Sequence, residues 1–310
     1  MNPRRCPLLN EFFTHYADYE YLLASSQLFL AMLGMGALLA PRDFISEIRQ
    51  PRSLFIGLGC QWMLVPLIAL AVATLVTVPT GVAIGIMLIA AVPGGTLSNI
   101  LTHFGRGNIA LSISLTSITT VAALVTTPLL LQLMMAEHLP DNFEMPTTDI
   151  ARDILLTLIF PLLVGMAIKV KTPEIASERF SKWVIRASLL LVMMMAIGAS
   201  GSGRLNPQAY GAISIGAVVL FCIALKLASV AVARVTNIPA RDGLAIVVEA
   251  TFRNLSLAVA VKAIVFPAQS GILDPIGDAV LFTTFLYGII SVFVTLFPVF
   301  YHQQVLAKTA

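Results

Sequence analysis

Nine long apolar runs constrain what this chain can fold into. A helix needs about 20 apolar residues to cross about 30 Å of hydrocarbon, and only 11% of this chain is charged, against roughly 25% in a soluble domain. We therefore predict an all-α integral membrane protein with nine transmembrane helices. The runs cover residues 23–40, 54–77, 82–103, 109–136, 151–169, 184–202, 209–233, 243–266 and 277–301.

The loops between these runs differ in charge, and the difference predicts orientation, because loops rich in Lys and Arg stay in the cytoplasm. With the N-terminus outside, the exterior segments hold only Arg4, Arg5 and Arg204. The cytoplasmic segments hold Arg42, Arg49, Arg52, Arg106, Lys169, Lys171, Arg179, Lys182, Arg186, Arg234, Arg241 and Lys308. We predict a multi-pass protein of the cell membrane with an extracytoplasmic segment at 1–22, one membrane domain at 23–301 and a cytoplasmic tail at 302–310.

Composition also narrows the function. The net charge of +3 follows from the basic cytoplasmic loops, so it gives no reason to expect a nucleic-acid partner. The three cysteines lack zinc or disulfide spacing, and the four histidines are scattered near the ends of the runs. We expect no cofactor and no resident metal, and we find no nucleophile with a base that would indicate an enzyme.

Two of the runs contain residues that a continuous membrane helix avoids. The third carries Pro93-Gly94-Gly95-Thr96-Leu97-Ser98-Asn99, and the eighth carries Glu249-Ala250-Thr251-Phe252-Arg253-Asn254. Unwound backbone is tolerated at membrane depth only inside protein or beside a wet cavity. Because the two runs cross the membrane in opposite directions, we predict an inverted repeat in which two broken helices cross at a solute or ion site. The alternative for the first break is a simple kink.

Polar side chains of four runs fall at a similar depth. With a rise of about 1.5 Å per residue, those of the third, seventh and eighth runs lie roughly 7 to 10 Å to the cytoplasmic side of the midplane. Those of the fourth run follow the cytoplasmic end of that run. Ser and Thr in a helix often bond only to their own backbone, so each position alone is weak evidence. An intramembrane lysine needs compensation, and we expect Lys226 to pair with Glu249. Lys262 we expect to extend toward the exterior interface without a role. The set at the shared depth is Ser98, Asn99, Ser112, Thr116, Lys226 and Glu249.

The order and spacing of several short strings resemble the sodium/bile acid cotransporter family, also called the bile acid:sodium symporter family, over about residues 27–301. The strings are Gly34-Met35-Gly36-Ala37, Gln61 with Pro66, Pro93 to Asn99, Gly107-Asn108, Leu111-Ser112, Thr116, Pro128, and Glu249 with Asn254. The resemblance implies the nine-span form of that fold, with a core domain and a panel domain that move past each other in alternating access.

The resemblance also implies site residues, with sodium as the only metal. A first sodium would be held by Ser98, Asn99, Ser112, Thr116 and Glu249. A second would lie at Gln61, Glu249, Ala250, Phe252 and Arg253, with main-chain oxygens around Ala250 and Phe252. The substrate would contact Thr96, Lys226, Arg253, Asn254 and Tyr287, near the ends of the broken helices.

Arg253 departs from the family pattern, which has a glutamine there. Two like charges 4 Å apart repel by about 4 kcal/mol at an effective dielectric of 20. Arg253 therefore either replaces the second sodium or turns outward to bind an anionic substrate.

The resulting hypothesis is sodium-coupled symport of an organic anion, bile-acid-like or a small carboxylate or sulfonate, within the lipid bilayer. The first alternative is a sodium-independent or proton-coupled anion carrier on the same fold, with Arg253 or Lys226 in place of a sodium ion. The second is a channel or an arsenite-type permease, which Cys60 beside Gln61 favours only faintly.

Overall fold

The computed structural model of the protein describes residues 7–39, 51–140, 142–270 and 274–309, without the side chains of 7–10, Thr96 and 304–309. In these ranges the regular structure is helical, as predicted. The elements, with η1 and η3 as π-helical turns and η2 as a 3-10 turn, are α1 (Pro7–Thr14), α2 (Tyr16–Gly36), α4 (Pro51–Gly59), η1 (Cys60–Leu64), α5 (Val65–Leu75), α6 (Thr80–Ala91), α7 (Thr96–Phe104), α8 (Ile109–Met135), η2 (Ala136–His138), α9 (Thr147–Ile154), η3 (Leu155–Ile159), α10 (Phe160–Lys171), α11 (Glu174–Gly201), α12 (Pro207–Val235), α13 (Ala240–Thr251), α14 (Leu255–Val265) and α15 (Pro275–Thr309).

Six helical segments of the described chain are long and apolar enough to cross a membrane, and α6 and α14 are shorter apolar helices. The six are Pro51–Leu75, Ile109–His138, Thr147–Lys171, Glu174–Gly201, Pro207–Val235 and Pro275–Gln303. The all-helical membrane fold is confirmed, while the count of nine spans stays a prediction. Several helices extend past the predicted runs, because a helix bonds its own backbone and can continue into polar surroundings where the apolar run stops.

Both predicted interruptions are breaks in the backbone. α6 ends at Ala91 and α7 begins at Thr96, and α13 ends at Thr251 and α14 begins at Leu255. The two open segments meet as an antiparallel bridge, in which Gly95 N donates to Phe252 O at 3.1 Å and Asn254 N donates to Pro93 O at 2.9 Å. This bridge pairs backbone groups that would otherwise lie unsatisfied inside the protein.

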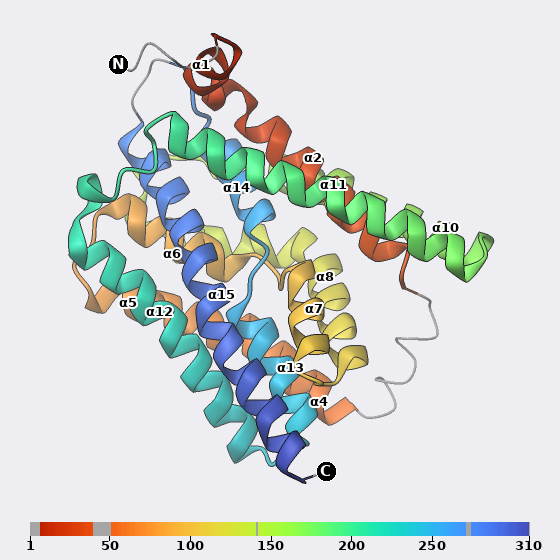
Figure 1. Cartoon of the computed structure of the whole chain (residues 1–310). Helices are drawn as coiled ribbons and strands as arrows, with labels where there is room; N and C mark the ends of the chain where they lie inside the picture. Colours follow the sequence, from red (N-terminus) through yellow and green to blue (C-terminus); the bar gives the residue numbers. More distant parts are fainter. Residues whose placement is uncertain (1–6, 40–50, 141, 271–273, 310) are drawn as a thin grey trace.

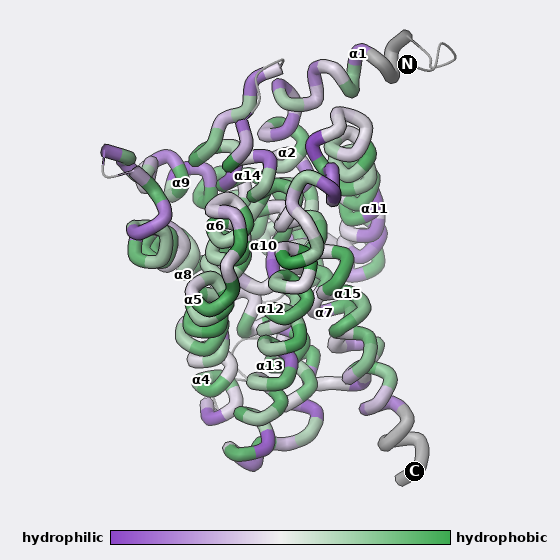
Figure 2. The backbone as a smooth tube through the Cα atoms, turned by 90° about the vertical axis from the view of Figure 1, so that its left-hand side faces the viewer, coloured by the Kyte–Doolittle hydropathy of each residue, from purple (hydrophilic) through white to green (hydrophobic). Residues whose placement is uncertain are grey.

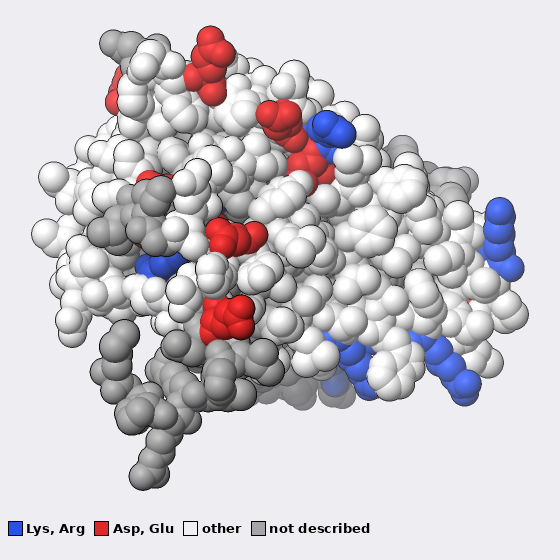
Figure 3. Space-filling model, turned by 90° about the horizontal axis from the view of Figure 1, so that it is seen from above, with Lys and Arg blue, Asp and Glu red and all other residues white. Residues whose placement is uncertain are grey.

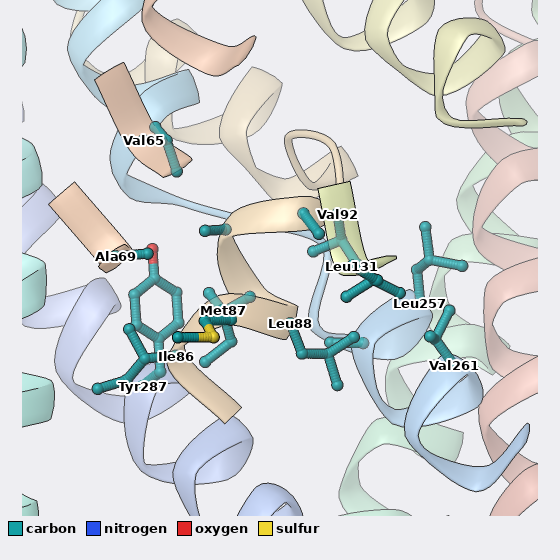
Figure 4. Packing of buried hydrophobic residues seen from close by; sticks show 14 of the residues in the cluster. Val65, Ala69, Ile86, Met87, Leu88, Val92, Leu131, Leu257, Val261 and Tyr287 are labelled. Atoms are coloured by element: carbon teal, nitrogen blue, oxygen red, sulfur yellow. The ribbon is translucent and has the colours of Figure 1, made fainter. Parts of the chain in front are cut away.

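The central element is α6, whose residues from Gly81 to Ala91 are all buried. A helix that is apolar on every side needs neighbours on every side. Figure 4 shows residues of α6 packed with residues of α5, α8, α14 and α15, among them Val65, Leu131, Val261 and Tyr287. The broken end of α6 is therefore held in the middle of the bundle.

α2 lies along α11 and α10, and these helices form a slanted layer across the remaining bundle (Figure 1). Close approach is possible because Gly36 of α2 faces Gly165 of α10, where a β-carbon on Gly36 would come within 3.0 Å of the Gly165 Cα. The layer also meets the bundle through α2 and α14. Whether it moves as a panel domain against a core domain stays a prediction.

Polar residues gather toward the two ends of the bundle, and the middle of most helices is apolar (Figure 2). This is the distribution that helices crossing a bilayer require. On the face seen from above, acidic side chains spread over the middle, while basic ones lie mostly toward its right-hand edge (Figure 3).

Candidate functional site

A buried carboxylate lies at the centre of the site. Glu249, on the last turns of α13, has 0% exposure. Its Oε1 accepts from Ser98 Oγ at 2.5 Å, Ser112 Oγ at 2.7 Å and Thr116 Oγ1 at 2.8 Å. Three helices, α7, α8 and α13, thus bring their polar side chains to one oxygen. The sequence placed these residues at a common depth, and the structure brings them together.

The cluster has more oxygen contacts than protons to fill them. Besides Glu249 Oε1, Ser98 Oγ lies 2.6 Å from Gly95 O, and Ser112 Oγ lies 2.8 Å from Asn99 Oδ1. Thr116 Oγ1 also lies 3.0 Å from Ser112 O and 3.4 Å from Asn99 Oδ1. Each hydroxyl has one proton, so in several of these contacts two oxygens face each other with no proton between them. A small hard cation among the oxygens would satisfy them.

The caps and neighbours of α8 fix the position of its hydroxyls. Asn108 accepts from Leu111 N at 3.1 Å and so caps α8 one turn before Ser112. The same side chain donates to Asp242 Oδ1 at 2.9 Å, and Asp242 Oδ2 accepts from Ser53 Oγ at 2.6 Å. Asp242 thus ties α4, α8 and α13 together. Sequence reasoning assigned Asp242 no role, although an acid in the first turn of a helix was a visible signal.

Arg253 points into the protein. It is 2% exposed, and its guanidinium donates to Gln61 Oε1 at 2.8 Å and to the main-chain oxygens of Ala90, at 3.3 Å, and Val92. These carbonyls end α6, where the helix dipole is negative and cations are favoured. The sequence left two positions open for Arg253, one inside the protein in place of a second sodium and one turned outward to a substrate. In the structure its side chain points inward.

Gln61 belongs to the π-helical turn η1, which interrupts the α4–α5 helix. Such turns often occur at functional sites because the extra residue redirects a side chain. Gln61 Oε1 also accepts from Gly94 N at 3.2 Å, at the first break. Among the described residues, Gln61 Nε2 and Glu249 Oε2 have no hydrogen-bond partner.

The residues predicted for a second sodium therefore do come together, but with a side-chain cation among them. Gln61 and Arg253 bond directly, and Glu249 and Ala250 are buried nearby in α13. Phe252 O is used by the bridge to Gly95. The oxygens that the guanidinium engages are those of Ala90 and Val92, which sequence reasoning did not single out.

A cavity of about 200 Å³ lies between the α2–α11 layer and the crossing of the broken helices. Its walls are mainly apolar, from Met32 and Met35 of α2 to Ile185 of α11. The first residues of α7 and α14 line it from the other side, together with Asn99 and Arg253. Gln27 also lines it, and its amide oxygen has no hydrogen-bond partner in the described part of the chain.

The predicted substrate residues divide between this cavity and other places. Asn254 lines the cavity and caps α14 through Leu257 N, at 3.1 Å, and the side chain of Thr96 lies outside the described residues. Tyr287 is fully buried and donates to Thr251 O at 2.6 Å, away from the cavity lining.

Lys226 lies in a different groove, with its amine 4.1 Å from the centroid of the Phe297 ring. The expected pair with Glu249 is not among the ion pairs of the described residues. A common depth along two helices does not fix which way their side chains point, and these two point into different spaces.

Lys262 is a second correction. It was expected to extend to the interface, but it is fully buried, and its amine donates to Glu20 Oε1 at 2.8 Å. Arg204 joins the same Glu20 and also Asp278, so four charges from α2, the α11–α12 connection, α14 and α15 meet at one end of the bundle. A partner 242 positions away in sequence gave no signal that sequence reasoning could use.

The chain is similar in sequence to several known transporters. The chain is 34% identical over 169 residues to the uncharacterized sodium-dependent transporter YocS of Bacillus subtilis (strain 168), 54% of this chain and 49% of that protein. It is 29% identical to the ileal sodium/bile acid cotransporter of Oryctolagus cuniculus, over 54% of this chain and 49% of that one. It is 31% identical to the sodium-dependent organic anion transporter of Bos taurus, over 54% and 45%.

The chain spans about half the length of these curated relatives, as the alignments cover 45% to 49% of each. The model of the sodium bile acid symporter family matches residues 26–205, more than half of the chain. That match includes Gln61, the first break and the hydroxyls of α8, while Glu249 and Arg253 lie beyond it and are brought to the same place by the fold. The family is one of symporters and not of enzymes, and this chain belongs to the sodium bile acid symporter family.

Proposed function

We propose that the chain is a secondary active transporter that carries an organic anion inward together with sodium. The observation that carries this proposal is the surplus of oxygen contacts around Glu249 Oε1. Ser98, Asn99, Ser112, Thr116 and Glu249 would be the sodium ligands, since they provide a carboxylate, an amide oxygen and hydroxyls at one point. A buried carboxylate also supplies the negative charge that a cation needs there.

The substrate would occupy the cavity beside the crossing. α7 and α14 both begin at its wall, and helix N-termini favour negative charge. The opposite wall is apolar, with Met32, Met35 and Ile185. An organic carboxylate or sulfonate with an apolar body fits both walls, from a small acid to a bile-acid-like molecule. Gln27 offers one further polar contact on the apolar side.

Alternating access would operate on the nine-span inverted repeat, with α2, α10 and α11 as the panel and the other long helices as the core. With the N-terminus outside, the cavity would extend from the middle of α2, at Gln27, toward the cytoplasmic side, since Leu38, just past the end of α2, also lines it. The acidic face in Figure 3 supports this orientation. Sodium would favour the substrate-accepting arrangement only by its difference in affinity between the two states.

Sodium binding can be tested before the substrate is known. The purified protein is heated in sodium chloride or in choline chloride at equal ionic strength, alone and with a panel of organic acids. Sodium at 100 times its dissociation constant stabilises by about 2.7 kcal/mol, so the unfolding temperature should rise by several degrees. Glu249→Gln should lose this rise, and Glu178→Gln, in an exposed pair on α11, should keep it. An equal sodium response in Glu249→Gln would contradict the proposal.

A second proposal concerns the number of sodium ions that are transported with each substrate molecule. The Arg253 guanidinium binds the carbonyls at the broken end of α6 together with Gln61, so it would act as a fixed cation in place of a second sodium. The transporter would then use one sodium per cycle. Sodium-driven uptake into vesicles should give a Hill coefficient near one, and a coefficient near two would contradict the replacement.

Two further arms separate the remaining alternatives. Uptake that persists without sodium and follows a pH gradient would favour a proton-coupled or sodium-independent carrier on the same fold. Uptake that does not saturate with substrate would favour a channel.

Arg253→Gln removes the fixed charge, and we expect it to raise the Hill coefficient toward two while the protein stays folded.

A further inference from the structure

A second groove lies outside the site around Glu249. It has a volume of about 690 Å³ and runs between α12, the start of α13 and the last part of α15. None of its lining residues borders the cavity beside the crossing. Its described lining contains Lys226 and Arg234 and no acidic residue.

The two basic side chains have no acidic partner within the ranges that the structure describes. The ion pairs of the described residues include neither Lys226 nor Arg234, and the Lys226 amine lies 4.1 Å from the centroid of the Phe297 ring. Lys226 precedes the end of α12 by nine residues, which is about 14 Å along the helix. A lysine at this depth is unfavourable unless an anion or water compensates it.

The open side of the groove is apolar. Leu227, Phe297 and Tyr301 are 59%, 65% and 60% exposed, on helices long and apolar enough to cross a membrane. In a bilayer these side chains meet acyl chains. An occupant must therefore enter from the lipid, with an anionic end for the two cations and an apolar body for the wall.

Lys226 and Arg234 both belong to α12. They are eight residues apart on α12, about 12 Å along the axis, and both line the same groove. The Lys226 side chain extends toward Phe297 of α15. Basic pockets between membrane helices at the cytoplasmic side are suited to lipid phosphate.

We propose that this groove binds one anionic phospholipid, with its phosphate between Lys226 and Arg234 and an acyl chain along Leu227 and Phe297. The lipid supplies the negative charge that the lining lacks. This site is separate from the sodium and substrate sites, so it does not depend on the transport assignment.

The test uses the full-length protein, delipidated in detergent and titrated with phosphatidylglycerol or phosphatidylcholine of the same acyl chains. Native mass spectrometry should detect one retained phosphatidylglycerol and much weaker retention of phosphatidylcholine. The double variant Lys226→Gln, Arg234→Gln should bind phosphatidylglycerol at least tenfold more weakly. The matched control Lys182→Gln, Arg186→Gln removes two basic side chains of α11 and should bind like the original chain.

Four results would overturn the proposal. Equal retention of both lipids would exclude recognition of the charge, and unchanged binding by the Lys226 and Arg234 variant would exclude these residues. Glycerol phosphate that competes as well as the intact lipid would show a soluble anion site. A dimer that disappears in the same variant, with no lipid adduct in the original protein, would assign the groove to a second copy of the chain.

Discussion

At position 94 only glycine leaves room for the carboxylate of Glu249. A β-carbon there would overlap Glu249 Oε2, and Gly94 N already donates to Gln61 Oε1. Gly94→Ala should therefore displace the carboxylate from Ser98, Ser112 and Thr116. We expect it to abolish the sodium-dependent rise in unfolding temperature, with a loss of about 1 to 3 kcal/mol from overpacking.

The control for this change is Gly59→Ala. Gly59 lies in a helix, and an added β-carbon there has no neighbour within 4 Å. It should keep the sodium response, because nothing near the site moves. A sodium response in Gly94→Ala equal to that of Gly59→Ala would show that the carboxylate does not hold the ion.

For single residues, the chemical role of a side chain was easier to predict than the direction in which it points. Glu249 and the hydroxyls could be identified because an acid and several oxygens at membrane depth are unusual. The inward course of Arg253 toward Ala90 O and Val92 O depends on side-chain torsions. Those torsions are set by neighbours that the sequence alone does not place.

Among elements, α8 matters most for the site, since it carries Ser112 and Thr116. Its cap, Asn108, also bonds Asp242 of α13. Asn206 caps α12 through Gln208 N at an exposed position and serves as the matched control. Loss of an Asn cap costs about 1 kcal/mol, so Asn206→Ala should lower stability by that amount and leave the sodium response unchanged.

Asn108→Ala should cost more, because it also leaves Asp242 without one of its donors. We expect a loss of about 2 to 3 kcal/mol together with a weaker sodium response, as the start of α8 loses its tie to α13. Sodium titrations followed by thermal unfolding measure both effects. Equal behaviour of the two cap variants would mean that Asn108 acts as a cap only.

The breaks that define the site were predictable at the level of elements. Proline and glycines at 93–95 stop α6, and the backbone they open needs a partner in a lipid environment. The partner was found in the second break, as the bridge between Gly95 and Phe252 shows. The π-helical turn at Cys60–Leu64 was not predictable, since no local residue pattern distinguishes it from a continuous helix.

For the whole molecule, hydropathy predicted the helical membrane fold, because the bilayer requires long apolar helices. It did not predict which helices meet at their ends. Glu20 and Lys262 both lie near the ends of apolar runs, where charged residues are common, so each alone indicates an interface position. Only the packing of α2 against α14 makes them partners, and that contact depends on the whole fold.

The buried charges at that end of the bundle should stabilise the whole arrangement of α2, α14 and α15. Glu20→Gln removes the acid that Lys262 contacts and leaves a fully buried ammonium, so we expect a loss of about 3 to 5 kcal/mol. Adding Lys262→Met should recover part of this loss, since the unpaired charge is then gone. Glu178→Gln, which breaks the exposed pair with Lys182 at 3.8 Å, should change stability by less than about 0.5 kcal/mol. Thermal unfolding in one detergent compares the three variants, and a double variant less stable than Glu20→Gln alone would mean that Lys262 contributes packing and other bonds beyond this ion pair.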